Sequence, residues 1–182
     1  NLATHDMILS LDADESLDEE AIEEIQNLKR HDFDELYLIK RKTFYCGHWV
    51  KYCGWYPDKK LRLWNRIHAN WSLDKLHETV LPNNLHAPTQ LLKGNILHYS
   101  YKTTQDHLNQ LDRFSTMAAK KYFDQGKKSF LFQAQWSYVI KFLEVYIYKL
   151  GILDGKTGFT IALLSAYGQF LKYHKLHLLN RS

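Results

Sequence analysis

Apolar positions in the first forty residues follow strand spacing, then helix spacing, then strand spacing again. The run Met7 to Leu11 is short and apolar, which predicts a buried strand. Apolar residues then recur every three or four positions, as on one face of a helix: Leu17, Ala21, Ile22, Ile25 and Leu28. Ser16 and Glu19 match an S-x-x-E capping box at the start of this helix. Leu36 to Ile39 predicts a second buried strand, and strand–helix–strand order favours an α/β fold.

The middle of the chain changes character. Residues 45–60 are rich in aromatic side chains and contain Gly47, Gly54 and Pro57, which predicts a long functional loop. The alternation in residues 61–64 then predicts a strand.

Helical spacing dominates from Thr104 onward. Thr104 caps the first predicted helix and Gly126 closes it. Two further helices are expected at about 130–150 and 159–174. We therefore expect an α/β region over residues 1–103 and a helical region over residues 104–182.

Composition narrows the functional classes. The 182 residues are 45% hydrophobic and 14% aromatic, enough for a sizeable core. A net charge of +4, with Lys and Arg spread along the chain, suits an anionic ligand or lipid surface and is too weak for nucleic-acid binding. Cys46 and Cys53 match neither a redox motif nor a zinc site, so we interpret them as reduced packing residues of a cytoplasmic protein.

The sequence Asp12-Ala13-Asp14-Glu15 directly follows the first predicted strand. Carboxylates at a strand end are hard oxygen ligands that hold Mg²⁺ or Mn²⁺ against phosphate oxygens. The alternative is that these acidic residues merely open the next helix, where its positive end favours them. That alternative accounts for Glu15 but leaves Asp12 and Asp14 unexplained, and the short motif alone leaves both interpretations open.

Five sequence blocks, taken together and in this order, resemble the family 2 glycosyltransferases. They are Leu9-Ser10-Leu11-Asp12-Ala13-Asp14-Glu15, Gly54-Trp55-Tyr56-Pro57-Asp58, Leu61-Arg62-Leu63, His77-Glu78 and Leu97-His98-Tyr99-Ser100-Tyr101. Within that family, the order is similar to bacterial lipopolysaccharide core glucosyltransferases. The resemblance implies the carboxyl-terminal part of a Rossmann-like GT-A fold, followed by a helical region. It also implies that the donor nucleotide is recognised by residues before Asn1, in a longer enzyme.

The resemblance also assigns a metal site. The last Asp of the motif, Asp14, would bind the divalent cation, and Asp12 would contact the donor sugar or ribose beside it. His98 would be the third member of the site. Without the resemblance, a single His in a strand is more often a hydrogen-bonded core residue.

Inverting sugar transfer also needs a carboxylate that removes the acceptor proton. Glu78 is our candidate, because it follows His77 where the resembling enzymes carry a His-Glu pair. The alternative is a surface Glu78 paired with Lys75.

Substrate contacts are expected from two segments. Trp55, Tyr56 and Asp58 would line the acceptor site with His77, since aromatic faces stack on sugars and carboxylates accept their hydroxyl groups. Arg62 would bind a phosphate. Alternatively, Trp55 and Trp64 fill the core and Arg62 is a solvated strand position.

The C-terminal helices mix aromatic, aliphatic and lysine residues, as interfacial helices do. They lack the roughly 18–20 uninterrupted apolar residues of a membrane span. Packing on the α/β region or on a second subunit is the alternative.

The sequence thus predicts an inverting glycosyltransferase that uses Mg²⁺ or Mn²⁺. It would transfer a sugar from a nucleotide-sugar donor to a lipid-linked or cell-envelope glycan at the cytoplasmic membrane face. A non-catalytic docking fragment and a divalent-metal phosphohydrolase are the alternatives.

Overall fold

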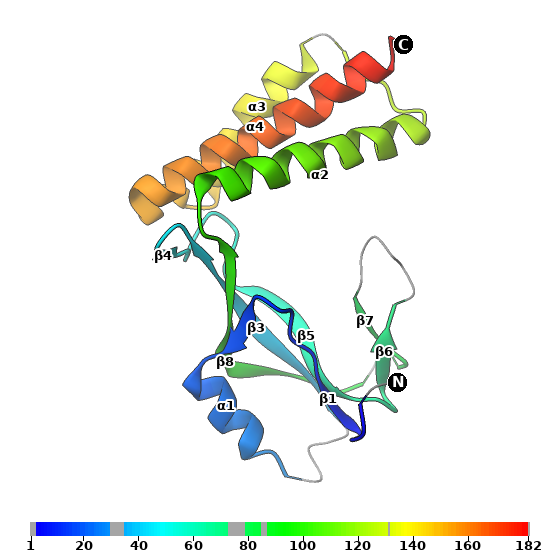
Figure 1. Ribbon diagram of the computed structural model, residues 1–182, viewed down its shortest axis with the longest axis vertical. Coiled ribbons are helices and arrows are strands. Elements are labelled where there is room, and N and C mark those ends of the chain that lie inside the picture. Colours follow the sequence, from blue (N-terminus) through cyan, green and yellow to red (C-terminus); the bar gives the residue numbers. More distant parts are fainter. Residues whose placement is uncertain (1–2, 30–34, 73–78, 85–86, 131, 182) are drawn as a thin grey trace. The chain divides into compact units, whose positions relative to one another are not determined.

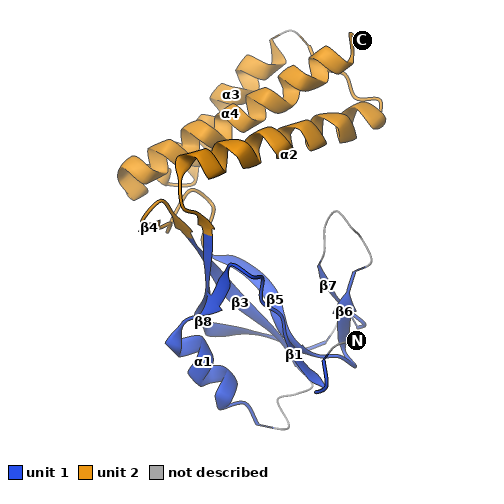
Figure 2. Cartoon of the chain, in the orientation of Figure 1, with its two compact units in different colours: residues 1–43, 57–99 blue, residues 44–56, 100–182 orange. Residues whose placement is uncertain are grey.

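The computed structural model describes residues 3–29, 35–72, 79–84, 87–130 and 132–181. These residues fall into two units (Figures 1 and 2). The first, the sheet unit, comprises residues 1–43 and 57–99, and the second, the helical unit, comprises residues 44–56 and 100–182. The architecture is therefore mixed α/β, with strands β3 and β8 running from one unit into the other.

The main sheet has the strand order β1-β5-β3-β8-β2, and β4 pairs with β3 (Figure 1). Its strands are β1 (Met7–Leu9), β2 (Glu15–Leu17), β3 (Leu36–Tyr45), β4 (His48–Trp49), β5 (Asp58–Asn65) and β8 (Thr89–Tyr101). The pairs β1–β5, β3–β5, β3–β4 and β2–β8 are antiparallel. A separate antiparallel hairpin consists of β6 (Ala69–Trp71) and β7 (Val80–Pro82).

Helix α1 (Glu19–Gln26) covers the sheet core, as its apolar spacing predicts. The predicted capping box is wrong, because Ser16 lies in β2 and the carboxylate of Asp18 accepts the Ala21 amide at 2.9 Å. Asp18 also accepts the backbone and side-chain N–H groups of Asn95 on β8. A Cβ atom on Gly94 would lie 2.2 Å from the Ala21 amide nitrogen, so α1 touches β8 where only glycine fits.

Two strands differ from the sequence prediction. The sequence predicts that the apolar run beginning at Met7 is buried, but among the described strands β1 pairs with β5 alone, and Leu9 is 40% exposed. An apolar run at a sheet edge has the same sequence pattern as a central strand, and only the pairing distinguishes them. Strand β2 forms where a helix start was expected, because Glu15 to Leu17 pair with Ile96 to His98 on β8.

The helical unit contains α2 (Thr104–Asp124), α3 (Gln133–Leu143) and α4 (Gly155–Leu179), with α4 packed on both other helices. A π-helical turn (Glu144–Tyr148) and a 3₁₀ helix (Gly151–Asp154) connect α3 to α4. The three predicted helices are therefore confirmed, but the N-cap of α2 is Thr103 rather than Thr104. Thr103 and Asp106 form a reciprocal capping box.

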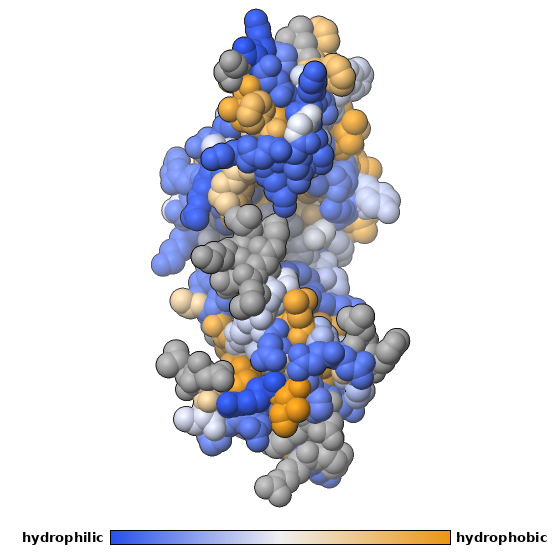
Figure 3. All heavy atoms as spheres, turned by 90° about the vertical axis from the view of Figure 1, so that its right-hand side faces the viewer, coloured by the Kyte–Doolittle hydropathy of each residue, from blue (hydrophilic) through white to orange (hydrophobic). Residues whose placement is uncertain are grey.

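Several large apolar side chains of this unit are exposed, and hydrophobic side chains line one edge of it in Figure 3. On α3 and the π-helical turn they are Trp136, Val139, Ile140, Leu143, Ile147 and Tyr148. None of the helices described is both long enough and apolar enough to cross a bilayer.

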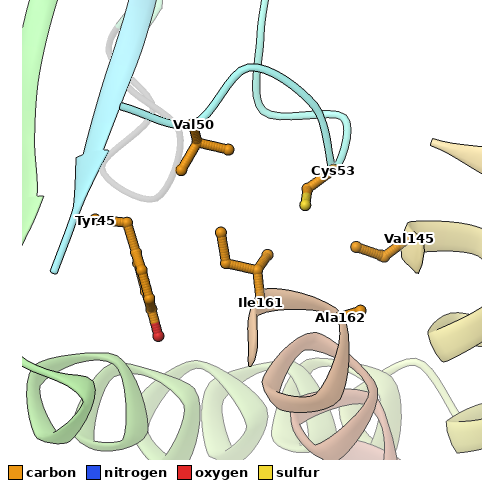
Figure 4. Packing of buried hydrophobic residues seen from close by; sticks show 6 residues of the cluster. All are labelled: Tyr45, Val50, Cys53, Val145, Ile161 and Ala162. Carbon is orange, nitrogen blue, oxygen red and sulfur yellow. The ribbon is translucent and has the colours of Figure 1, made fainter. Parts of the chain in front are cut away.

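The core of the helical unit draws on the segment that the sequence predicted as a functional loop (Figure 4). Val50 and Cys53 from this segment are buried, and Tyr45 belongs to β3. They pack with Ile161 on α4 and its neighbours. Part of the predicted loop therefore has a structural role.

Candidate functional site

Asp14 and His98 meet at the edge of the main sheet. Glu15 is the register partner of His98, and the Tyr99 amide donates to the Asp14 carbonyl at 2.9 Å. This pairing sets the Asp14 Oδ2 atom 3.2 Å from His98 Nε2. The side chain of Asp14 is half-exposed, whereas that of His98 is 17% exposed.

The Asp14–His98 pair fits two positions around one small divalent cation. Ligand atoms each ~2.1 Å from Mg²⁺ and at right angles lie about 3 Å apart. Asp12 does not join them, since its carboxylate contacts Arg62 at 2.7 Å. Within the described ranges, no three His, Cys, Asp or Glu side chains converge on one point. The structure therefore brings two of the three expected metal ligands together.

Arg62 owes its position to a β-bulge. Tyr37 on β3 pairs with Leu63 and the next residue, Leu38, pairs with Leu61, which leaves Arg62 as the extra residue of β5. Bulges re-aim side chains. Here the bulged side chain, only 7% exposed, turns toward Asp12 and Glu15.

Glu15 is the buried anion that holds two arginines together. Its side chain is fully buried, 3.0 Å from Arg62 and 3.4 Å from Arg41, and it also accepts the Asp12 amide. Since Arg62 hydrogen-bonds Asp12 as well, the pKa of Asp12 lies below its usual value despite partial burial, which opposes the shift. Asp12 therefore stays ionised beside the Asp14–His98 pair.

Asp58 closes the other end of this network. It accepts two hydrogen bonds from Arg41, at 3.0 and 2.7 Å, and lies 3.1 Å from Lys60. The predicted substrate contacts Asp58 and Arg62 are therefore parts of one ion-pair network. Arg62 is not the solvated strand position of the alternative interpretation.

A polar cavity of about 470 Å³ opens beside the network. Its lining combines cationic residues from β3 and β5 with residues of the β6–β7 hairpin. They are Asp12, Arg41, Lys59, Lys60, Leu61, Arg62, Trp71, Thr79 and Val80.

The other expected site residues lie elsewhere or outside the described ranges. Trp55 packs against Tyr45, Tyr101 and His107 in the helical unit, as in the core-filling alternative. Tyr56, the next residue, is half-buried in the same unit. Trp64 is 2% exposed and belongs to the core.

His77 and Glu78 lie outside the described residues, as does Lys75. Thr79, which directly follows Glu78 in the sequence, lines the cavity.

Sequence reasoning missed Glu15, Arg41 and Trp71. The sequence pattern places Glu15 at a helix start and gives no sign of its position between two arginines. The spacing of Asp58 and Lys60 by two residues is a usable signal for a shared face of β5. The sequence holds no comparable signal for Trp71, because its place at the cavity depends on the hairpin.

Comparisons with known proteins indicate a class of enzyme. The chain is similar to uncharacterized glycosyltransferases of three Rickettsia species. These are from Rickettsia typhi (27% identity over 99% of this chain and 65% of the relative), Rickettsia prowazekii (27%, 97% and 63%) and Rickettsia conorii (25%, 97% and 66%). The chain thus spans about two thirds of the length of these relatives. Neither a protein-family model nor a solved structure matches it.

Proposed function

We propose that this chain is part of a metal-dependent, inverting glycosyltransferase of the family 2, GT-A type. It would transfer a sugar from a nucleotide-sugar donor to a lipid-linked or cell-envelope glycan, as lipopolysaccharide core enzymes do. The observation that carries the proposal is the 3.2 Å approach of Asp14 and His98 on neighbouring chain segments. The similarity to proteins named glycosyltransferases supports the reaction class.

In this proposal, Asp14 and His98 hold Mg²⁺ or Mn²⁺. A divalent cation bound there supplies positive charge for the departing diphosphate. Asp12 is kept ionised by Arg62, so its carboxylate oxygens can accept hydroxyl groups of the donor sugar or ribose. The Arg62 side chain is in turn fixed by buried Glu15, which orients Asp12 without taking part in the chemistry.

The acceptor hydroxyl would lose its proton to Glu78 as its oxygen attacks the anomeric carbon from the face opposite the nucleotide. This role of Glu78 rests on the resemblance of the His77-Glu78 block, which lies outside the described residues.

A peripheral membrane contact is the second part of the proposal. The exposed side chains of α3 and the π-helical turn include Trp136, Ile140 and Tyr148, and such faces insert at headgroup depth. The lysines contribute less than the sequence suggests. Lys141 and Lys149 are paired with Glu144. Contact at the cytoplasmic face would then depend mainly on apolar burial.

The complete protein tests the enzymatic proposal. Nucleotide sugars would be screened for Mn²⁺-dependent turnover with the wild type, Asp14→Asn and Glu78→Gln. We expect Asp14→Asn to abolish metal-dependent turnover, and Glu78→Gln to reduce it by ~10²–10⁴-fold while donor binding survives.

Donor hydrolysis that needs no acceptor would instead indicate a phosphohydrolase. No turnover with any donor, together with retained membrane or partner binding, would indicate a docking fragment.

A further inference from the structure

The cavity beside β5 holds more positive charge than its carboxylates balance. Arg41 and Arg62 are paired with Asp12, Glu15 and Asp58. Lys60 shares Asp58 with Arg41 and remains 40% exposed.

Lys59 carries the positive charge that these carboxylates do not balance. It is exposed, lines the cavity, and within the described part of the chain no carboxylate lies within ion-pair distance of it. An anion entering here would meet Lys59 and Lys60 without displacing an existing partner of Lys59.

The lining also includes an aromatic side chain. Trp71 on β6 packs edge-to-face on buried Trp64, with ring centroids 5.9 Å apart and an interplanar angle of 81°. This contact fixes the indole while leaving 40% of the residue exposed. Exposed indole faces stack on the C–H surfaces of sugar rings, and the adjacent Thr79 can hydrogen-bond sugar hydroxyls.

The volume of the cavity suits one or two sugar rings. β1 ends at Leu9, and the Ser10 amide makes the following bond to the Arg62 carbonyl. The segment Lys59 to Leu61 therefore continues past the end of β1 and borders the opening. A volume of about 470 Å³ lies within the ~300–1,000 Å³ range of small-ligand sites.

We propose that this cavity binds an acidic sugar, one that carries a phosphate or carboxylate group, as part of the acceptor glycan. The ring would stack on Trp71 and the acidic group would face Lys59 and Lys60. This inference rests on the proposed glycosyltransferase function, because it identifies the class of acceptor. It also separates the acceptor subsite from the Asp14–His98 pair, which would hold the metal and the donor diphosphate.

Titration of the chain with small probes in the presence of EDTA tests the assignment. The probes are glucose 6-phosphate, glucuronate, glucose and inorganic phosphate, and their binding is measured by calorimetry or by NMR. We expect at least one acidic sugar to bind more tightly than both glucose and inorganic phosphate. Whichever of glucose 6-phosphate and glucuronate binds more tightly identifies the acidic group as phosphate or carboxylate.

Variants then locate the site. Lys59→Gln should weaken binding of the acidic sugar about fivefold. Trp71→Ala should weaken it about tenfold, and Trp71→Phe should restore most of the affinity because it keeps an aromatic ring. Lys93→Gln is the matched control, since Lys93 is also an exposed strand lysine but does not line the cavity. It should leave the affinity unchanged.

Equal affinities for the acidic sugars and glucose would overturn the proposal, as would equal loss in Lys59→Gln and Lys93→Gln. Binding that requires Mn²⁺ and disappears in Asp14→Asn would also overturn it, because the probe would then occupy the metal site. Failure of sugar transfer by the complete protein is a separate result. It would refute the enzymatic proposal while metal-independent binding of an acidic sugar remained measurable.

Discussion

The carboxylate of Glu15 lies 3.0 Å from the guanidinium of Arg62, in a pair whose two side chains are 0% and 7% exposed. A buried carboxylate between two arginines is costly to desolvate, and removal of one partner leaves uncompensated charge. The pair therefore fixes the side chain of Arg62, and Arg62 in turn positions Asp12. The positions of both side chains thus depend on Glu15.

Replacing Glu15 tests this relationship. Glu15→Gln keeps the shape but leaves Arg41 and Arg62 without their shared anion, so we expect unfolding free energy to fall by about 3 kcal/mol. Chemical denaturation measures this change. Glu23→Gln on the exposed surface of α1 is the control and should change stability by less than ~0.5 kcal/mol. A similar loss of unfolding free energy in both variants would show that the buried pair contributes no more to stability than an exposed glutamate.

A second prediction concerns the contact between α1 and β8. Gly94→Ala would place a Cβ atom 2.2 Å from the Ala21 amide nitrogen, which forces the helix away from the strand. We expect a loss of about 1–3 kcal/mol, measured by denaturation. Gly47→Ser is a useful comparison. Gly47 has open space around it, so any loss of stability on substitution arises from its φ angle of +92° alone. A fully stable Gly94→Ala variant would contradict the close approach.

The helical unit should lose stability in mild acid because of one histidine. His107 is 3% exposed and lies 3.1 Å from the Tyr45 hydroxyl, and burial lowers its pKa from 6.5 to about 4. The unfolded chain therefore binds the additional proton between pH 6.5 and 4. Stability from neutral His107 is complete above pH 6.5 and falls as the pH drops toward 4, by roughly 3 kcal/mol in total.

Denaturation curves between pH 7 and 4.5 measure this loss. In His107→Gln most of the pH dependence in this window should disappear, whereas His174→Gln, at an exposed position of α4, should retain it. An unchanged slope in His107→Gln would contradict the assignment to His107.

Membrane contact is tested with vesicles of anionic lipid. Replacing both Trp136 and Ile140 with Ser should reduce pelleting of the full-length protein, since both side chains are more than 60% exposed and their removal costs no core packing. Because Glu144 pairs with both Lys141 and Lys149 and offsets part of their charge, part of the binding should persist at high salt. Complete release by salt would show that electrostatic attraction dominates instead.

The sequence predicted the periodic elements and missed those that depend on pairing. The apolar spacing in α1, α2 and α4 is local, so the helices could be recognised. The exposure of Leu9 and the formation of β2 depend on which strands lie beside them, which no local pattern records. The helix cap was misplaced by two residues because Asp18 has Asn95 as an additional partner across the fold.

The candidate site likewise contains residues that the sequence could identify and contacts that it could not. Residue chemistry identified Asp12, Asp14 and Arg62 as candidates, and the resemblance added His98. The pairing of β2 with β8 explains why Asp14 and His98 meet. The bulge that turns Arg62 inward is a property of strand register, so the partnership of Arg62 with Glu15 was invisible in the sequence. Trp55 has an aromatic side chain suited to sugars, yet packing in the helical unit accounts for it.

The metal site is the central claim, and Mn²⁺ binding monitored by electron paramagnetic resonance tests it most directly. The wild-type chain should bind one Mn²⁺, and both Asp14→Asn and His98→Gln should weaken that binding at least tenfold without unfolding the protein. Asp112→Asn, at an exposed carboxylate of the helical unit, should leave it unchanged. Mn²⁺ binding that is equally strong in the wild type, Asp14→Asn and His98→Gln would contradict the account.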